Sequence, residues 1–332
     1  MCYNFLYKFW TEKVTAMEYR DIQALAGRIR ENVKKVLIGR EEQMNLILAA
    51  MIAGGHVLME DVPGTGKTVM ARSMAKSMNC RFSRVQFTPD LLPADITGMS
   101  VYQPAKGQFE FIPGPVFTHI LLADEINRAT PRTQSALLEC MEEKQVTEGG
   151  VTRRLDAPFL VLATQNPVET QGTFPLPEAQ LDRFLIRISM GYPDDGEALR
   201  MMQRFVRSSP LEELRPVAEE EEIGEAQRLF SLCQVSEPVM AYIAALCRET
   251  RDENRAQLGV SPRGMLALLR VSQAYAAIQG RDFVIPDDVK YLAVPVLAHR
   301  VILRGLYGKS GENEKYIREI LEKIPAPTEE VA

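Results

Sequence analysis

Several features are scarce in this sequence, and each scarcity excludes a class of function. The five cysteines, Cys2, Cys80, Cys140, Cys233 and Cys247, form no Cys-x-x-Cys pair and have no histidine at metal-ligand spacing. Neither a zinc site nor a disulfide framework is therefore predicted. A reducing cytoplasm is the compartment that fits this cysteine usage best.

Basic residues are in the minority, with 39 against 44 acidic residues and a net charge of -5. Proteins that bind the nucleic-acid backbone usually concentrate positive charge on one face, so we expect no nucleic-acid partner. No apolar run reaches the roughly 18 to 20 residues that a membrane-spanning helix needs, so we expect no membrane insertion.

Residues 1–18 are predicted to form an N-terminal extension. Its opening segment, CYNFLYKFW, is apolar but is not followed by a small-residue cleavage site, which argues against a signal peptide. We interpret it as a frayed or packed extension, with a membrane or partner anchor as the alternative. Met17 stands just before the regular pattern begins, so translation could also start there.

What the sequence does contain is an alternation of short apolar runs and amphipathic stretches. The short runs, which predict buried strands, cover residues 56–60, 82–87, 120–123 and 159–163. Helical spacing of apolar residues covers residues 19–35, 41–53, 69–78 and 134–142. Such an alternation predicts an α/β fold with a parallel sheet and helices on both faces.

Two segments interrupt this alternation, and both have the pattern of a β-hairpin. One covers about residues 99–113 around a Lys106-Gly107 turn, and the other covers residues 145–155 around Gly149 and Gly150. After residue 191 the strand patterns largely stop, and helical stretches are broken by prolines and glycines. We therefore predict an α/β core over residues 19–190 and an all-α domain over residues 191–332.

The strongest motif is DVPGTGKT, which begins at Asp61 and lies between a predicted strand and a predicted helix. This is the context of a phosphate-binding loop, whose glycines let backbone N–H groups approach phosphate oxygens. The residues expected to bind the nucleotide are Val62, Pro63, Gly64, Thr65, Gly66, Lys67 and Thr68. Lys67 would contact the terminal phosphates of ATP, and the Thr68 hydroxyl would ligate Mg²⁺.

One position departs from the usual motif, because Asp61 stands where its first glycine is expected. Aspartate tolerates the left-handed backbone conformation better than most residues. We therefore expect the turn to survive, with the Asp61 carboxylate facing away from the phosphates.

Two further strand ends carry polar residues suited to ATP hydrolysis. The predicted strand from Ile120 ends in Asp124 and Glu125, and the strand over residues 159–163 is followed by Thr164, Gln165 and Asn166. Asp124 would hold Mg²⁺, and Glu125 would orient and deprotonate the attacking water. Asn166 would position that water near the γ-phosphate.

Together these segments resemble the MoxR family of AAA+ ATPases. The resemblance covers about residues 20–310 and rests on five blocks in a fixed order, GHVLMEDVPGTGKT, FTPDLLPADITG, GPVFTHILLADEINRATPRTQSALLECMEE, LATQNPVETQGTFPLPEAQLDRF and GVSPRG. It implies a P-loop AAA+ core, in which helices flank a parallel sheet that carries two β-hairpin insertions. It also implies a displaced helical lid at the C-terminal end.

The resemblance also assigns roles to individual residues. Asn166 would be sensor 1, Arg183 the arginine finger that reaches the ATP of a neighbouring subunit, and Arg263 sensor 2. Ile38 and Gly39 resemble the segment that contacts adenine. The alternative for Arg183, Arg263 and Ile38 is a purely structural role, as surface residues or as part of the core.

A capping pattern predicts where Arg263 lies. Ser261 is suited to cap a helix and Pro262 to occupy its first position. Arg263 would then lie in the first turn, where it could turn toward phosphates.

The resemblance implies a chaperone-like ATPase that forms a homo-hexameric ring and remodels or matures a client protein. It further implies a partner with a von Willebrand factor A (VWA) domain. The first alternative is a nucleic-acid motor or loader, in which Arg153 and Arg154 of the second hairpin would contact phosphates. The second alternative is a scaffold that binds nucleotide with negligible turnover.

Overall fold

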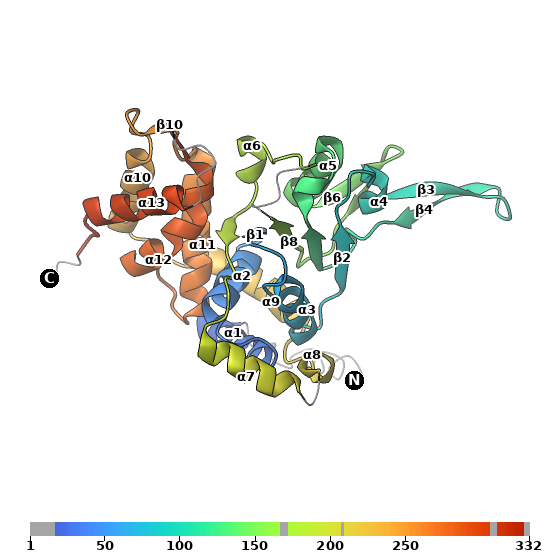
Figure 1. Cartoon of the computed structure of the whole chain (residues 1–332), viewed down its shortest axis with the longest axis horizontal. Coiled ribbons are helices and arrows are strands. Elements are labelled where there is room, and N and C mark those ends of the chain that lie inside the picture. Colours follow the sequence, from blue (N-terminus) through green and yellow to red (C-terminus); the bar gives the residue numbers. More distant parts are fainter. Residues whose placement is uncertain (1–16, 167–171, 207–208, 306–310, 329–332) are drawn as a thin grey trace, which may run out of the picture.

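The computed structural model describes residues 17–166, 172–206, 209–305 and 311–328. Its centre is a five-stranded parallel sheet with the strand order β2-β5-β8-β1-β9 (Figure 1). The strands are β1 (Val57–Glu60), β2 (Phe82–Gln86), β5 (Ile120–Asp124), β8 (Leu160–Gln165) and β9 (Ile186–Ile188). The four predicted strands and their parallel pairing are confirmed, and β9 is an additional strand that the apolar pattern did not predict.

Successive residues of each central strand enter two different apolar cores. In β1, Val57 and Met59 belong to one buried cluster and Leu58 belongs to the other. This is the twofold alternation of a strand whose two faces are both covered. The sheet is therefore the middle layer of a three-layer α/β/α core.

Helices cover both faces of the sheet. The helices of this part are α1 (Tyr19–Val33), α2 (Glu41–Ile52), α3 (Lys67–Ser77), α4 (Pro93–Thr97), α5 (Pro131–Glu143) and α6 (Glu178–Leu181), with the short 3-10 helix η1 (Ile126–Arg128). Apolar residues of α1, α2 and α3 share the cluster of Val57 and Met59, whereas those of α4 and α5 share the cluster of Leu58.

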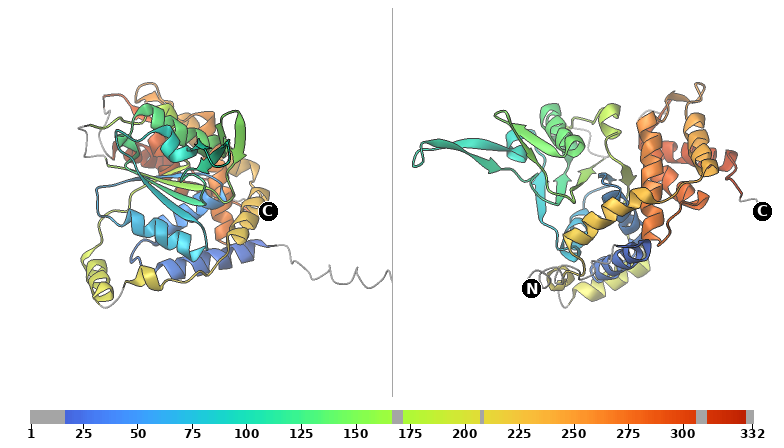
Figure 2. Two further views of the ribbon diagram at one scale, coloured as in Figure 1. Left: turned by 90° about the vertical axis from the view of Figure 1, so that its right-hand side faces the viewer. Right: turned by 180° about the vertical axis from the view of Figure 1, so that it is seen from behind.

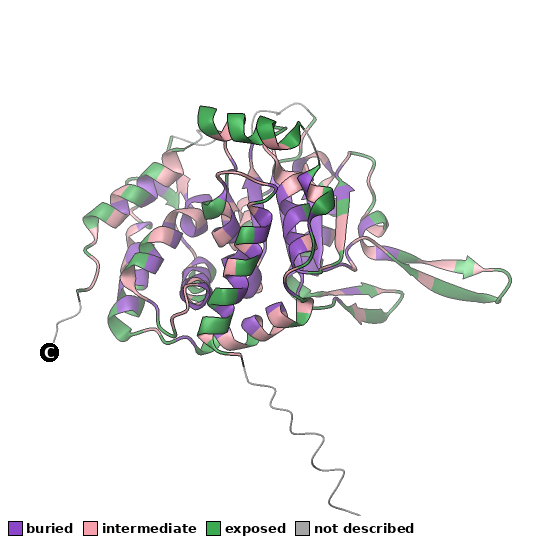
Figure 3. Cartoon of the chain, turned by 90° about the horizontal axis from the view of Figure 1, so that it is seen from below, coloured by how far each residue is buried: buried purple, intermediate pink, exposed green. Residues whose placement is uncertain are grey.

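Both predicted hairpins are present. They consist of the antiparallel pairs β3 (Gly98–Gln103) with β4 (Gln108–Pro113) and β6 (Gln145–Glu148) with β7 (Val151–Arg154). The first hairpin extends away from the body of the protein and has mainly exposed side chains (Figures 1 and 3). The two hairpins contact each other, because the Ser100 hydroxyl donates to Glu148 at 2.6 Å and the Arg153 guanidinium lies 3.8 Å from the centre of the Phe111 ring.

The chain beyond residue 191 is mainly helical, as predicted. Its helices are α7 (Asp195–Phe205), α8 (Pro210–Glu213), α9 (Glu220–Leu229), α10 (Glu237–Glu249), α11 (Pro262–Ile278), α12 (Pro286–Leu297) and α13 (Glu312–Lys323), with the 3-10 helices η2 (Phe230–Leu232) and η3 (Ala298–Arg300). A short antiparallel pair of β10 (Ala256–Leu258) and β11 (Ile302–Leu303) adds to the expected helices. The helices from α10 onward and the first hairpin lie at opposite ends of the molecule (Figures 1 and 2).

Apolar packing is continuous from the sheet into the helical part. Ile223 of α9 and Leu268 of α11 belong to the same buried cluster as Ile47 of α2 and Val57 of β1. The division at residue 191 is thus a change of secondary structure rather than a break in the core, and the domain limits 1–18, 19–190 and 191–332 remain a proposal. Among the residues described, no helix has the length and apolar character to cross a membrane.

Candidate functional site

The phosphate-loop motif forms the turn between β1 and α3. Gly64 and Gly66 have φ angles of +86° and +91°, a region that favours glycine because it has no Cβ atom. Helix α3 begins at Lys67, so the loop ends at a helix N-terminus as predicted. The Lys67 ammonium donates to the backbone oxygens of Asp61 at 2.8 Å and Val62 at 3.3 Å.

A cavity of about 410 Å³ opens beside this loop. It brings together four segments that are distant in the sequence. Its lining residues are Pro63, Gly64, Gly66, Lys67, Thr68, Val69, Arg84, Gln86, Asp124, Glu125, Thr164 and Asn166. The carboxyl ends of β1, β5 and β8 meet here because neighbouring parallel strands end at the same edge of the sheet. Lys67, Thr68, Asp124, Glu125 and Asn166 therefore share one cavity.

The side chains of Asp124 and Glu125 reach the same cavity because strand geometry ends between them. Glu125 has φ 57° and ψ 50°, the left-handed conformation, which breaks the alternation of β5. The Thr164 hydroxyl donates to Asp124 Oδ1 at 2.6 Å and accepts a hydrogen bond from the Glu125 backbone N–H at 2.8 Å. Thr164 thus ties both acidic residues to the neighbouring strand β8.

The oxygen atoms of this cavity suit a hard divalent cation. Thr68 supplies a hydroxyl and Asp124 a carboxylate, both oxygen ligands of the kind that Mg²⁺ accepts. Within the described parts of the chain, no group of three or more His, Cys, Asp or Glu residues could hold a metal by itself. A cation at Thr68 and Asp124 would therefore need further oxygens from a bound phosphate or from water.

Electrostatics at Lys67 reflect both burial and nearby carboxylates. Desolvation lowers the pKa of Lys67, and the charges of Asp61, Asp124 and Glu125 partly oppose this shift. Partial burial leaves this cation less hydrated than a surface lysine. The position therefore favours a ligand that brings several negative charges, such as a triphosphate.

Two residues of β2 line the cavity although the sequence pattern did not single them out. Arg84 Nη2 lies 2.6 Å from Asp124 Oδ2, and the Gln86 amide donates to Glu125 Oε2 at 2.7 Å. They flank the buried Val85 on the exposed face of the strand. This polar alternation was the available signal, but the order β2-β5 was needed to place the two side chains beside Asp124 and Glu125.

Asp61 faces away from the cavity, as predicted, but its backbone conformation was predicted wrongly. It is absent from the described non-glycine residues with positive φ, which are Asn79, Glu125 and Lys144. Its N–H instead continues the strand pairing to Gln165 at 3.2 Å. The carboxylate accepts hydrogen bonds from the Ser189 hydroxyl at 2.9 Å and from the backbone N–H groups of Met190 and Gly191. Asp61 therefore ties the phosphate loop to the segment that leaves β9.

The predicted adenine segment lies next to the loop. A Cβ atom placed on Gly66 would be 3.7 Å from the Leu37 side chain, so Leu37 lies beside the phosphate loop and Ile38 and Gly39 follow it directly in the chain. Gly39 has φ +69° and lies against the carboxylate of Glu197 on α7. Ile38 is only partly buried. Ile38 and Gly39 are thus near enough to the loop to be candidates for nucleotide contact.

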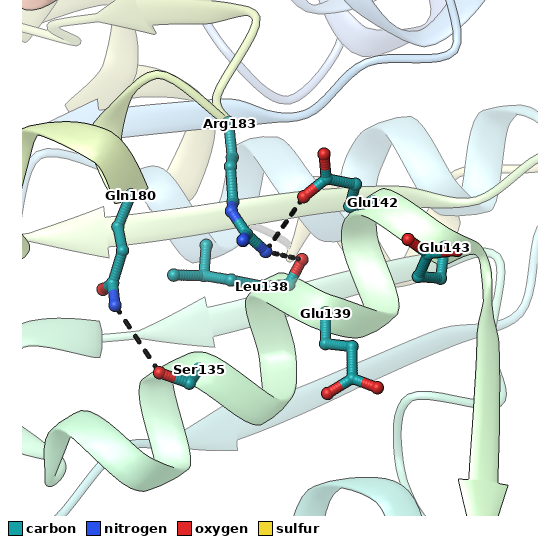
Figure 4. Close-up of a pocket in the computed structure, with 7 residues that line it drawn as sticks. All are labelled: Ser135, Leu138, Glu139, Glu142, Glu143, Gln180 and Arg183. Carbon is teal, nitrogen blue, oxygen red and sulfur yellow. Dashed lines mark hydrogen bonds and ion pairs between the residues drawn. The ribbon is translucent and has the colours of Figure 1, made fainter.

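The two predicted arginines lie together at another place, where both pair with Glu142. Figure 4 shows Arg183 between Leu138 and Glu142. Arg183 Nη1 donates to the Leu138 backbone oxygen at 3.1 Å and is 3.1 Å from Glu142 Oε2. Arg263 Nη1 is 3.0 Å from the other oxygen of Glu142. Ser261 caps α11 and Pro262 is its first residue, so the prediction that Arg263 lies in the first turn is confirmed. Neither arginine is among the described residues that line the phosphate-loop cavity.

Family models match two parts of the chain. The ATPase family associated with various cellular activities (AAA) matches residues 56–186, and the AAA lid domain matches residues 248–324. The first match contains the phosphate loop, the acidic pair, Asn166 and Arg183. The second match contains Arg263 and most of the C-terminal helices.

Relatives extend over nearly the whole chain. The uncharacterized protein YeaC of Bacillus subtilis is 48% identical over 313 residues, which cover 94% of this chain and 98% of that protein. Chaperone MoxR1 of Mycobacterium tuberculosis is 38% identical over 82% of this chain and 74% of its own length. Protein MoxR of Methylorubrum extorquens is 32% identical over 92% of this chain and 96% of its own length.

Solved structures agree with the architecture. A protein from Cytophaga hutchinsonii that is described as a candidate ATPase is 39% identical, with a TM-score of 0.86 over 93% of this chain and 97% of that one. A full-length MCM homologue from Methanopyrus kandleri has a TM-score of 0.58 at 19% identity, over 85% of this chain and 61% of that one. This second likeness concerns the fold alone.

Proposed function

Because this chain belongs to the MoxR family of AAA+ ATPases, we propose that it hydrolyses ATP to ADP and phosphate with Mg²⁺ as the metal ion. The observation that carries the proposal is the single cavity shared by Lys67, Asp124, Glu125 and Asn166. These are the residue types that phosphoryl transfer to water requires at one place.

Each group has a distinct task in this proposal. The loop N–H groups and Lys67 bind the phosphates of ATP, and Glu125 accepts a proton from the attacking water. Asn166 lies at the end of β8 and holds that water in line with the γ-phosphate. Thr68 and Asp124 would hold Mg²⁺, which neutralises charge on the β- and γ-phosphate oxygens when bound.

The position of the arginines supports a ring. Arg183 and Arg263 are bound to Glu142, away from the cavity of their own chain. An arginine that stabilises the charge of phosphoryl transfer must contact the phosphates. We therefore propose that both arginines serve the ATP of a neighbouring subunit, in a closed homo-hexamer formed by repeated head-to-tail contacts.

The biological role that we propose is chaperone-like remodelling or maturation of a client protein. One relative carries the name chaperone MoxR1, and the exposed first hairpin offers aromatic side chains, with Phe109 71% exposed. A partner with a VWA domain belongs to the same proposal. Cytoplasmic location is proposed from the free thiols Cys80, Cys140, Cys233 and Cys247.

The two alternatives have less support. Arg153, which a nucleic-acid motor would use on phosphates, stacks on the Phe111 ring and donates to the Val151 backbone oxygen at 3.3 Å. Salt-sensitive DNA binding together with DNA-stimulated hydrolysis would restore this alternative. A scaffold without turnover is tested by measuring phosphate release directly.

Glu125→Gln is the central experiment. The variant keeps the shape of the side chain but cannot accept the proton, so hydrolysis should fall about 100-fold while ATP binding persists. Phosphate release and the affinity for a fluorescent ATP analogue are measured on the same preparation. The ATP-loaded variant then serves as bait for client and VWA-domain partners. Unchanged hydrolysis would remove Glu125 from the mechanism.

A further inference from the structure

Arg300, at the end of η3, is a buried cation whose hydrogen bonds are all satisfied within the chain. Only 6% of its surface is exposed. Its Nε donates to Asp182 Oδ1 at 2.6 Å, and Nη2 donates to the backbone oxygens of Asp182 at 3.3 Å and Phe184 at 2.6 Å. Nη1 donates to the backbone oxygens of Leu185 and Val296. All five guanidinium donors are therefore used.

The same network reaches the helix that carries Arg263. The second oxygen of Asp182 accepts from the Ser261 hydroxyl at 3.1 Å, and this hydroxyl also caps the Gly264 N–H at 3.2 Å. A Cβ atom on Gly264 would be 2.7 Å from Arg300 Cδ. The first turn of α11 is thus packed directly against the Arg300 side chain.

These contacts hold the immediate neighbours of the two functional arginines. Asp182 precedes Arg183 in the chain, and Ser261 is two residues before Arg263. One arginine belongs to the core and the other to the helical lid, so no local structure connects them. Glu142 pairs with both arginine heads, but it is partly exposed and would be replaced by phosphate oxygens in a working site.

We propose that Arg300 is a positioning residue that fixes Arg183 and Arg263 as one unit, so that both are presented together to the ATP of the neighbouring subunit. The inference rests on the proposed function, because it takes Arg183 as an arginine finger. Two groups that approach a transition state from separately moving parts would have to be ordered at each turnover, whereas a rigid pair is ordered in advance. The buried guanidinium supplies that rigidity through its planar set of donors.

Arg300→Lys is the first test. Lysine keeps the positive charge, but its single ammonium cannot reach Asp182 and the carbonyls of residues 184, 185 and 296 together. A shift of about 1 Å in a catalytic group can lower a rate about 100-fold, so kcat should fall between about 10- and 100-fold. Affinity for a fluorescent ATP analogue should stay within about twofold, since the phosphate loop is untouched.

Arg281→Lys is the matched control. Arg281 also forms a two-point pair with a buried carboxylate, at 2.8 Å and 2.6 Å from the oxygens of Asp288. It lies in the lid, where its side chain bonds to Asp288 and to the Phe283 backbone oxygen. Within the described part of the chain it has no hydrogen bond or ion pair with residues 182–185 or with the first turn of α11. We expect Arg281→Lys to lose about as much thermal stability as Arg300→Lys but to keep the kcat of the parent chain. Equal loss of kcat in both variants would mean that Arg300 acts through lid stability alone, and would overturn the positioning role.

Mixed rings provide a readout that a structural defect would not give. Arg300→Lys chains keep Glu125, and Glu125→Gln chains keep Arg183 and Arg263 in their native positions. Where the cavity of an Arg300→Lys chain faces the arginines of a Glu125→Gln chain, the site between them is complete. The mixture should hydrolyse ATP several-fold faster than either variant alone. Arg183→Ala mixed with Glu125→Gln is the reference, and it should show the same rescue.

The outcomes separate the inference from the function on which it rests. Rescue of Arg183→Ala without rescue of Arg300→Lys overturns the positioning role and leaves the shared site intact. Rescue of neither overturns both.

If Arg300→Lys does not fold, Ser261→Ala replaces it, because this change releases α11 from Asp182 and keeps the Arg300 to Asp182 pair. It should lower kcat several-fold and be rescued in the same mixture. A normal kcat in Ser261→Ala would then overturn the inference.

Discussion

The phosphate-loop cavity differs from the region of Arg183, Arg263 and Glu142, which we call the arginine face. The difference lies in how much of an active site each contains. The cavity joins a cation, two carboxylates and an amide at the ends of adjacent strands, all within the core. The arginine face joins Arg183 of the core to Arg263 of the lid through Glu142. Among the described residues, the lining of the cavity includes neither Arg183 nor Arg263, and the arginine face includes no residue of the phosphate loop. In the proposed ring, one chain would thus contribute halves of two different sites.

Replacing Arg183, the proposed arginine finger, tests this comparison with the largest expected effect. Arg183→Ala should lower kcat about 10³-fold, because the charge that develops in phosphoryl transfer loses a direct partner. ATP affinity and ring assembly should change little, as measured by analogue binding and light scattering. Arg255→Ala is the control, since the Arg255 side chain pairs with Glu319 at 2.7 Å and lies 4.5 Å from the centre of the Tyr316 ring, both in the lid. Full activity in an assembled Arg183→Ala ring would show that the arginine face is not part of the site.

A change in the cavity should instead affect binding within the same chain. Lys67→Ala removes the cation that contacts the terminal phosphates, so ATP affinity should fall about 100-fold. Calorimetry with Mg²⁺ and ATP measures the change. Because Lys67→Ala chains keep both arginines, they should still stimulate Arg183→Ala chains in a mixture. Failure of this stimulation would argue that the two regions are not independent halves.

Asp61 tests how the cavity is attached to the rest of the core. Asp61→Gly restores the usual motif residue but leaves the Ser189 hydroxyl and two backbone N–H groups without their acceptor. Among these donors the Met190 N–H is buried. An unsatisfied buried donor destabilises by about 1 to 3 kcal/mol, so the free energy of unfolding in urea should fall by about that amount. Activity of the folded protein should remain near that of the parent chain. Unchanged stability would mean that water replaces the carboxylate.

The smallest effect is expected at Arg84. Its pair with Asp124 Oδ2 occupies the carboxylate that would face the metal ion. The Arg84 side chain is 48% exposed, so the pair should contribute no more than about 1 kcal/mol. Arg84→Ala should therefore lower the Mg²⁺ concentration for half-maximal hydrolysis by about fivefold or less. A higher Mg²⁺ requirement would show that Arg84 assists the cavity instead of competing for Asp124.

Local sequence patterns were sufficient to predict helices and strands whose apolar residues repeat within one segment. Ile22, Leu25 and Ile29 at helical spacing predicted α1, and the apolar run before Asp124 predicted β5. The three-residue strand β9 was missed because Ile186 to Ile188 is too short to show a period. The wrong backbone prediction for Asp61 has a physical cause. The hydrogen bond of its N–H to Gln165 keeps it in the sheet, and this partner is 104 residues away in the chain.

The sequence alone predicted the phosphate loop, the acidic pair and Asn166, because each of these groups lies within a few residues of a predicted strand end. Parallel strands then bring those ends together by the geometry of the sheet itself. Only the tertiary structure decided that Arg84 and Gln86 contact the acidic pair and that Arg183 and Arg263 meet at Glu142. It also decided the place of Arg300, whose role depends on acceptors from residues 182–185 more than 110 positions away. Contacts between distant segments depend on how whole helices pack, which no local pattern encodes.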